Sequence, residues 1–322
     1  MGRSTIFRLS VAAWKAIAWR ASVGIIAVAI ATIAIANLIG CQHEAEKSAE
    51  LWLGGDVNLG DGGKEQLRAI TGMVQGAVGI VNLEGPVSGR LPTKDRLRLW
   101  NSPSTLKELS AVKVRVAGIA NNHAKDAGVA GPEQTADALR SNGILPAGGR
   151  ADAAFVQING VSIAVTAHDL SEGVPPNLEA DLSAARRRSE VLIATFHVTG
   201  PPSYLPHPEL RRAAEIAYHA GANIIAAHGS HMLGPVERRP HAVIAWGLGN
   251  VAFACDCTQE EDAVLLRVAV GHDKVLSAEV LPLQAGINNR PVKAAADSNA
   301  IFDLLEAIGS KGLQRKGNYA SF

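Results

Sequence analysis

Acidic, amide and imidazole side chains recur at five points along this 322-residue sequence, each directly after a short apolar run. Such side chains supply the hard oxygen and borderline nitrogen ligands that a divalent metal ion takes in proteins. The five groups are Asp56 with Asn58, Asn82 with Glu84, residues 121–123 with Asp126, His197, and His228 with His231. Taken singly, each is more often a turn or hydrogen-bonding residue, so only the combination indicates a metal site.

The elements that must position these groups follow an α/β rhythm. Short apolar runs ending in polar or Gly-rich turns predict strands at residues 50–53, 79–82, 112–116, 161–165, 191–195, 224–225 and 242–245. Helices are predicted from residue 131 to the Asn-Gly pair at 142–143, from 208 to 220, and over 301–308. Since ligands collect at the carboxyl ends of strands in open α/β sheets, the five groups are expected to meet at one edge.

The charge of the chain is nearly balanced, with 31 Lys and Arg against 30 Asp and Glu. This balance argues against a protein built to coat nucleic acid. The first 40 residues hold four bases, Arg3, Arg8, Lys15 and Arg20, and no acid, which leaves 27 bases against 30 acids in the rest.

Residues 21–40 form a 20-residue stretch without a charge, which is long enough to cross a bilayer as a helix. Bases before it and acids after it place the N-terminus in the cytoplasm and the body on the extracytoplasmic side of the cell membrane. Residues 38–41 also resemble the lipobox of bacterial lipoproteins, in which Cys41 would be lipidated. Residues 1–45 are therefore expected to be either a lipoprotein signal or a single-pass anchor.

Six ordered motifs between residues 51 and 253 resemble the bacterial capsule synthesis (CapA) family of poly-γ-glutamate biosynthesis proteins, which are similar to calcineurin-type metallophosphoesterases. The motifs are Gly-Asp-Val-Asn-Leu-Gly at 55–60, Asn-Leu-Glu-Gly-Pro at 82–86, Asn-Asn-His at 121–123, Ala-Gly-Ala-Asn at 220–223, His-Gly-Ser-His at 228–231 and Trp-Gly-Leu-Gly-Asn at 246–250. The resemblance implies a four-layer α-β-β-α sandwich of two mixed sheets. It would occupy residues 46–290, followed by a closing helix and tail at 291–322.

The resemblance also implies the roles of the site residues. The implied ligands of a divalent Mn, Fe or Zn ion are Asp56, Glu84, Asn122, His197, His228 and His231. His123 is implied as the general acid or an outer donor, and the secondary positions are Asn58, Asn82, Asn121, Asp126 and Asn250. The implied reaction is metal-assisted hydrolysis of an anionic polymer such as poly-γ-glutamate or a capsular glycan, or of a phosphoester.

Three positions depart from the family pattern. Asn58 stands where phosphoesterases place a histidine, Asn223 stands where the family usually has Asp, and His197 is followed by Val198 rather than by Trp-Gly and an acid. A weakened or metal-free site is one consequence. The alternative to a hydrolase is then a non-catalytic accessory that binds the polymer during assembly or export.

Two further features are interpreted as structural. Cys255 and Cys257 are one residue apart, a spacing that closes only a small ring, so no catalytic role is expected of them. The Arg run at 186–188 is interpreted as a solvated helix face, with contact to an acidic polymer as the alternative.

Overall fold

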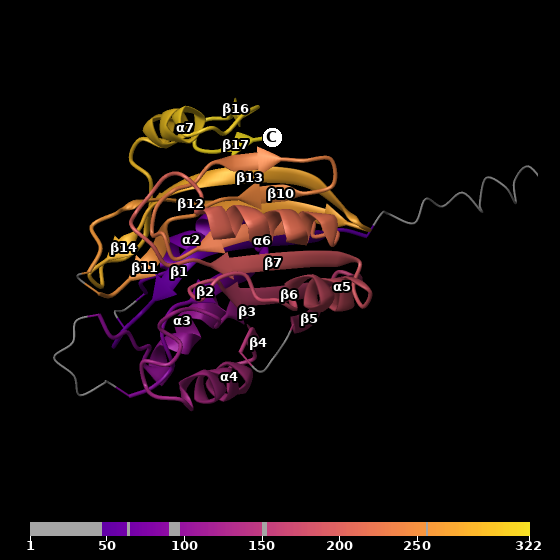
Figure 1. Cartoon of the computed structure of the whole chain (residues 1–322). Helices are drawn as coiled ribbons and strands as arrows, with labels where there is room; N and C mark the ends of the chain where they lie inside the picture. Colours follow the sequence, from indigo (N-terminus) through magenta and orange to yellow (C-terminus); the bar gives the residue numbers. More distant parts are fainter. Residues whose placement is uncertain (1–46, 63–64, 90–96, 150–152, 256) are drawn as a thin grey trace, which may run out of the picture. The chain divides into compact units, whose positions relative to one another are not determined.

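A computed structural model of the chain describes residues 47–62, 65–89, 97–149, 153–255 and 257–322 (Figure 1). The predicted anchor and Cys41 lie outside these residues. In the part that is described, no helix is both long enough and apolar enough to cross a membrane. Residues Lys47–Phe322 group as one compact unit.

The first of two mixed sheets has 11 strands within the described residues. Its main path runs β16-β17-β13-β12-β1-β2-β3-β4, while β11, β14 and β15 pair alongside. Its strands are β1 (Ala49–Asn58), β2 (Val78–Leu83), β3 (Val114–Gly118), β4 (Leu145–Ala147), β11 (Asn250–Phe253), β12 (Asp262–Gly271), β13 (Lys274–Gln284), β14 (Gly286–Ile287), β15 (Lys293–Ala294), β16 (Gln314–Arg315) and β17 (Ala320–Ser321).

The second sheet runs β5-β6-β7-β8-β10-β9. Its central strands β6, β7, β8 and β10 are parallel, and β5 and β9 are antiparallel to their neighbours at the two edges. The strands are β5 (Ala153–Ile158), β6 (Val161–Asp169), β7 (Val191–His197), β8 (Ile224–His228), β9 (Val236–Arg238) and β10 (Val243–Ala245).

Three hydrophobic clusters define four layers. One cluster fills the space between the sheets with residues from β1, β6, β7, β8 and β12. A second packs the other face of the first sheet against α2 (Arg68–Met73), α3 (Leu106–Ala111) and α4 (Gly131–Ser141). The third packs the second sheet against α5 (Leu178–Arg186) and α6 (Pro208–His219), and Figure 1 shows these two helices away from α3 and α4. The two-sheet α/β sandwich implied by the sequence is thus confirmed.

The predicted helices form for the expected local reasons. In α4, Pro132 lies in the first turn, and Gly143 takes a φ of +72° just after the end. In α6, Nδ1 of His207 accepts a hydrogen bond from the Glu209 backbone N–H. The buried face of α6 consists mostly of small side chains at helical spacing. Its residues are Leu210, Ala213, Ala214 and Ala217.

The longest hairpin was not among the predicted elements. Strands β12 and β13 pair from Asp262↔Gln284 to Gly271↔Lys274. A short 3₁₀-helix, η1 (Pro103–Thr105), was likewise not predicted. Helix α7 (Ser298–Ala307) corresponds to the predicted closing helix, and β17 after it adds to the edge of the first sheet by pairing with β13.

Candidate metal centre

The candidate site lies where carboxyl ends of strands from the two sheets meet. Asp56 comes from β1, Glu84 follows β2, and His197 and His228 end β7 and β8. Strand β1 carries a register shift between Leu53 and Asp56 against β2. This irregularity turns the Asp56 carboxylate toward the second sheet.

A close backbone crossing holds that irregularity. The Asp56 backbone N–H donates to the Gly249 carbonyl at 3.1 Å. A Cβ atom on Gly55 would lie 1.8 Å from the same carbonyl oxygen, so only glycine fits there. The segment 246–250 therefore supports the site.

Asp56 is buried, and each of its carboxylate oxygens accepts a hydrogen bond. Its Oδ1 accepts from Asn82 Nδ2 at 2.8 Å, and its Oδ2 accepts from the Gly229 backbone N–H at 2.9 Å. Burial by itself would raise the pKa of Asp56, but hydrogen bonding and charge from His231, with the charges of His228 and His197, hold this pKa well below its usual range. Asp56 is therefore a fixed negative charge at the centre of the site.

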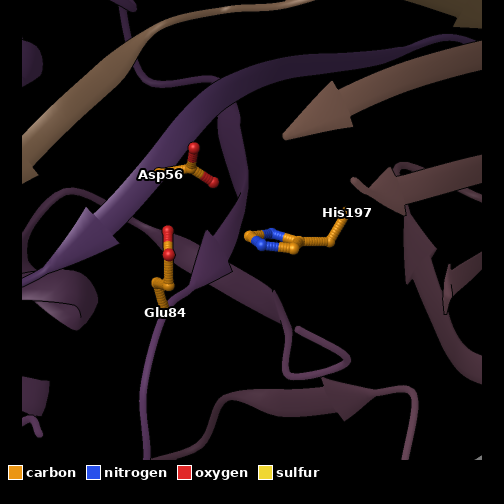
Figure 2. A group of neighbouring side chains, drawn as sticks. All are labelled: Asp56, Glu84 and His197. Atoms are coloured by element: carbon orange, nitrogen blue, oxygen red, sulfur yellow. The ribbon is translucent and has the colours of Figure 1, made fainter. Parts of the chain in front are cut away.

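Glu84 and His197 complete a three-residue group with Asp56. One ligand atom from each of the three residues lies within 4.8 Å of the others, and all three side chains point to a common point in Figure 2. The Glu84 Oε2 atom is buried and has no hydrogen-bond partner among the described residues. Burial, reinforced by the Asp56 charge, raises the pKa of Glu84 to about 8.

His197 is held by amides on both sides. Its Nε2 lies 2.8 Å from Asn122 Oδ1, and its Nδ1 lies 3.3 Å from Asn82 Nδ2. Because Oδ1 can only accept and Nδ2 can only donate, this arrangement assigns the proton to Nε2. Burial lowers the pKa of His197 to about 4, which keeps the ring neutral, with its one lone pair on Nδ1 toward Asn82.

His228 and His231 approach Asp56 from the loop after β8. Nδ1 of His228 lies 3.8 Å from Asp56 Oδ1 and, like Glu84 Oε2, has no hydrogen-bond partner in the described part of the chain. Burial lowers the pKa of His228. Nδ1 of His231 lies 3.4 Å from Asp56 Oδ2, and its Nε2 lies 3.8 Å from Glu84 Oε1.

The backbone of His231 is unusual. Its φ is +56°, a conformation that side chains other than glycine rarely adopt. The ring is hydrogen-bonded through Nδ1 to Asn250 Oδ1 at 2.9 Å. It packs edge-on against Phe253, with 4.8 Å between the two ring centres. Burial would lower the pKa of His231, but the carboxylates of Asp56 and Glu84 outweigh it and raise the pKa to about 10.

His123 lies at the margin of the group. Its Nε2 lies 3.9 Å from Glu84 Oε1, and its Nδ1 lies 2.8 Å from Asp126 Oδ2. Asp126 also accepts from the Leu99 backbone N–H at 2.7 Å, which fixes the carboxylate. His123 is thus an oriented and partly exposed imidazole beside the buried cluster.

Two of the secondary amides donate hydrogen bonds to backbone carbonyls. Asn58 Nδ2 donates to the Glu84 and Trp100 carbonyls, both at 3.0 Å. Asn121 Nδ2 donates to the Leu83 carbonyl at 2.9 Å. They shape the loops that carry the ligands instead of pointing into the cluster.

Sequence reasoning missed two groups that hold the site together. The buried Asn101 side chain donates to the Glu84 and Gly85 carbonyls and accepts from the Leu59 N–H at 2.7 Å. The Gly229 N–H that binds Asp56 was also missed. Neither has a signal in the sequence, because Asn101 follows no predicted strand and a backbone N–H has no residue type.

The donor set fits a divalent cation. Two ionisable carboxyl groups lie among three imidazoles, and two of their buried atoms, Glu84 Oε2 and His228 Nδ1, lack any partner within the described residues. Buried polar groups are normally hydrogen-bonded, so such unpaired atoms indicate a missing ligand. Mixed oxygen and imidazole donors suit Mn²⁺, Fe²⁺ or Zn²⁺.

The fold and this site define a class: two-sheet α/β sandwiches with a cluster of carboxylate and imidazole side chains at the strand ends. Within that class, a family model described as bacterial capsule synthesis protein PGA_cap matches residues 50–255. The chain belongs to this family, as the sequence motifs implied.

Two curated relatives carry related names. The chain is 27% identical over 227 residues to the PGA biosynthesis protein CapA of Bacillus subtilis (strain 168), which covers 63% of this chain and 60% of the relative. It is 24% identical over 243 residues to the capsule biosynthesis protein CapA of Bacillus anthracis. This match covers 67% of this chain and 59% of the relative. The match thus spans about three fifths of these relatives.

Among solved structures, a hypothetical protein from Thermus thermophilus has a similar fold. The TM-score is 0.51 at 10% sequence identity, over 73% of this chain and 99% of the other. At this identity the likeness concerns the fold alone.

Proposed function

We propose that this chain is a metal-dependent hydrolase that cleaves an amide or phosphoester bond of an anionic polymer in capsule or poly-γ-glutamate biosynthesis. The observation that carries the proposal is the buried group of Asp56, Glu84 and His197, in which Glu84 Oε2 has no partner in the described part of the chain. The names of the two curated relatives support the biosynthetic setting. The basic and apolar leader supports tethering to the cell membrane, with the body on the extracytoplasmic side.

In this proposal Asp56 and Glu84 hold the ion together with imidazoles from His197, His228 and His231. A divalent ion supplies Lewis-acid activation of water and neutralises charge that builds in the transition state. The Asn82 amide and the Gly229 N–H fix the Asp56 carboxylate, so its oxygens need no reorganisation when the ion binds.

His123 supplies the proton. Hydrolysis joins a water oxygen to the phosphorus or carbonyl carbon and releases an oxygen or nitrogen that must be protonated. His123 can deliver this proton from Nε2, the nitrogen that faces Glu84, because Asp126 binds its other nitrogen.

A second candidate is a polymer-binding accessory without catalysis. The hydrogen bonds of Asn58 favour it. The Asn58 amide donates to two backbone carbonyls, and β1 contains no histidine, so this strand contributes Asp56 alone to the site. A site with fewer ligands binds metal more weakly.

Metal content and turnover of the purified full-length chain decide between the two candidates. After exposure to Mn²⁺, Fe²⁺ or Zn²⁺ and removal of free ion, bound metal is measured by plasma mass spectrometry. Hydrolysis is then followed with p-nitrophenyl phosphate and with a γ-glutamyl oligomer. The variants are Glu84→Gln and, as a matched control, Asp137→Asn, an exposed acid on α4 that pairs with Arg140.

The hydrolase proposal expects bound metal and turnover in the wild type and in Asp137→Asn, and loss of both in Glu84→Gln. A folded chain that binds metal without hydrolysing either compound supports the accessory. A folded chain that binds none of the three metals contradicts the hydrolase.

A further inference from the structure

A basic pocket lies outside the candidate metal centre. It has a volume of about 480 Å³ and is bounded by the first turns of α6, by β9 and by the turn after α7. Three cationic side chains line it, Arg211 from α6, Arg238 from β9 and Lys311 after α7. They come from segments up to 100 positions apart, so the fold, and not one helix face, brings them together.

These cations are not neutralised by neighbouring acids. Within the described residues, no ion pair joins Arg211, Arg238 or Lys311 to a carboxylate. Arg211 Nε donates to the Pro206 carbonyl at 3.3 Å, and its guanidinium lies 5.7 Å from the centre of the Trp246 ring. Arg238 donates to the Val275 carbonyl at 2.7 Å and to the Ala242 carbonyl at 3.3 Å.

The acid that lines this pocket is already engaged. Glu237 Oε1 accepts from Arg239 Nε at 2.7 Å, and its Oε2 accepts from Trp246 Nε1 at 3.3 Å. Arg239 also binds Glu215 through both of its terminal nitrogens. The pocket therefore presents an excess of positive charge to whatever enters it.

A second pocket lies beside the basic pocket and is lined by residues next in sequence to two of the candidate ligands. It has a volume of about 460 Å³ and shares Pro206 and Trp246 with the basic pocket. Val198 and Ser230, the neighbours in sequence of His197 and His231, also line it. The loop of residues 199–208 contributes four prolines, whose restricted backbones give the wall a preset shape.

We propose that the basic pocket binds an anionic group of an extended acidic chain, while a bond elsewhere in that same chain lies at the metal centre. The second pocket would hold the intervening part against Trp246 and the prolines. The ligand chemistry is a carboxylate or phosphate carried on a polymer. The identity of the polymer rests on the proposed function, whereas the anion site rests on the cations and the pocket alone.

Binding is tested with the full-length chain in detergent and a fluorescein-labelled γ-glutamyl decamer, by fluorescence anisotropy. The test variant is Arg211→Gln/Lys311→Gln. Arg238 is left intact because it bonds two backbone carbonyls. The matched control is Arg212→Gln/Lys316→Gln, which removes two exposed cations that do not line the pocket. Thermal unfolding of each variant confirms that it is folded.

The test variant is expected to raise the dissociation constant about tenfold, because it removes two of the three cations that line the pocket. The control is expected to change it by less than about twofold. Equal weakening in both variants, or none in the test variant, would overturn the proposal. The measurement is made in chelator and again with Mn²⁺, so a failure of hydrolysis leaves its result intact.

Competition distinguishes the two sources of the anion. Unlabelled oligo-γ-glutamate, linear polyphosphate of equal charge and a neutral amidated oligomer each compete for the labelled decamer. Stronger competition by oligo-γ-glutamate assigns a carboxylate polymer, and stronger competition by polyphosphate assigns a phosphate polymer. Competition by the neutral oligomer as strong as by the acid would show that charge is not recognised.

Discussion

The Nδ1 atom of His123 lies 2.8 Å from Oδ2 of Asp126, which leaves the other ring nitrogen facing Glu84 at 3.9 Å. Leu99 holds Asp126 through its backbone N–H. The imidazole is therefore aimed by a fixed carboxylate, the arrangement that a proton donor beside a reacting group requires.

The first prediction concerns this pair. His123→Gln is expected to lower kcat by about 10²–10⁴, the usual contribution of a positioned acid, while metal content stays unchanged. Asp126→Asn is expected to have a smaller effect, because it misorients the ring without removing it. Steady-state kinetics and metal analysis check both variants. His219→Gln, an exposed histidine on α6, is the control, and loss of metal in His123→Gln would instead make this residue a ligand.

The second prediction concerns pH and the metal-free protein. Burial raises the pKa of Glu84 from 4.5 to about 8, and the neighbouring carboxylates raise that of His231 from 6.5 to about 10. A group whose pKa is raised on folding takes up protons as the chain folds, so its contribution is lost as pH rises through the folded value. Between pH 6.5 and 8, the free energy of unfolding therefore falls as pH rises, by at most about 1.4 kcal/mol per pH unit for each of the two groups.

Thermal unfolding in chelator is expected to show Tm falling over this interval. Added Mn²⁺ binds the deprotonated donors, so the Tm difference between metal and chelator should widen as pH rises. Glu84→Gln should flatten the slope measured in chelator, while Glu179→Gln, an exposed acid on α5, should not. Parallel Tm curves with and without metal would contradict the assignment of Glu84 as a ligand.

The third prediction concerns the backbone crossing below Asp56. Gly55→Ala places a Cβ 1.8 Å from the Gly249 carbonyl oxygen, so the strand must move. We expect a loss of about 3 kcal/mol in unfolding free energy and loss of metal binding. Gly72→Ala in α2 has nothing within 4 Å of the added Cβ and should gain about 0.5–1 kcal/mol. Denaturant unfolding compares the two, and equal stabilities would refute the crossing.

The fourth prediction concerns the tether. If the chain is a lipoprotein, Cys41→Ser abolishes lipidation and releases the body from the membrane or leaves an unprocessed, larger form. If the leader is an uncleaved helix, size and membrane retention stay the same. Fractionation with mass measurement of the mature chain distinguishes these two results.

The sequence by itself determined the alternation of strands and helices and the residue types at the strand ends. These features are local: the proline and glycine that bound α4 act on their own turns, and apolar spacing marks the buried face of α6. Strand β12 was not predicted because nearly all of its residues are buried, on both faces of the sheet. Such a strand lacks the alternation of apolar and polar residues that distinguishes a strand from a buried helix segment.

Only the tertiary structure decided what each polar side chain does. Asn58 and Asn82 are the same residue type near the carboxyl ends of the neighbouring strands β1 and β2, yet one binds backbone carbonyls and the other binds Asp56. The Gly229 N–H reaches Asp56 across 173 positions of sequence. Hydrogen-bond partners depend on distances and directions that exist only once the two sheets have packed, so no local pattern can specify them.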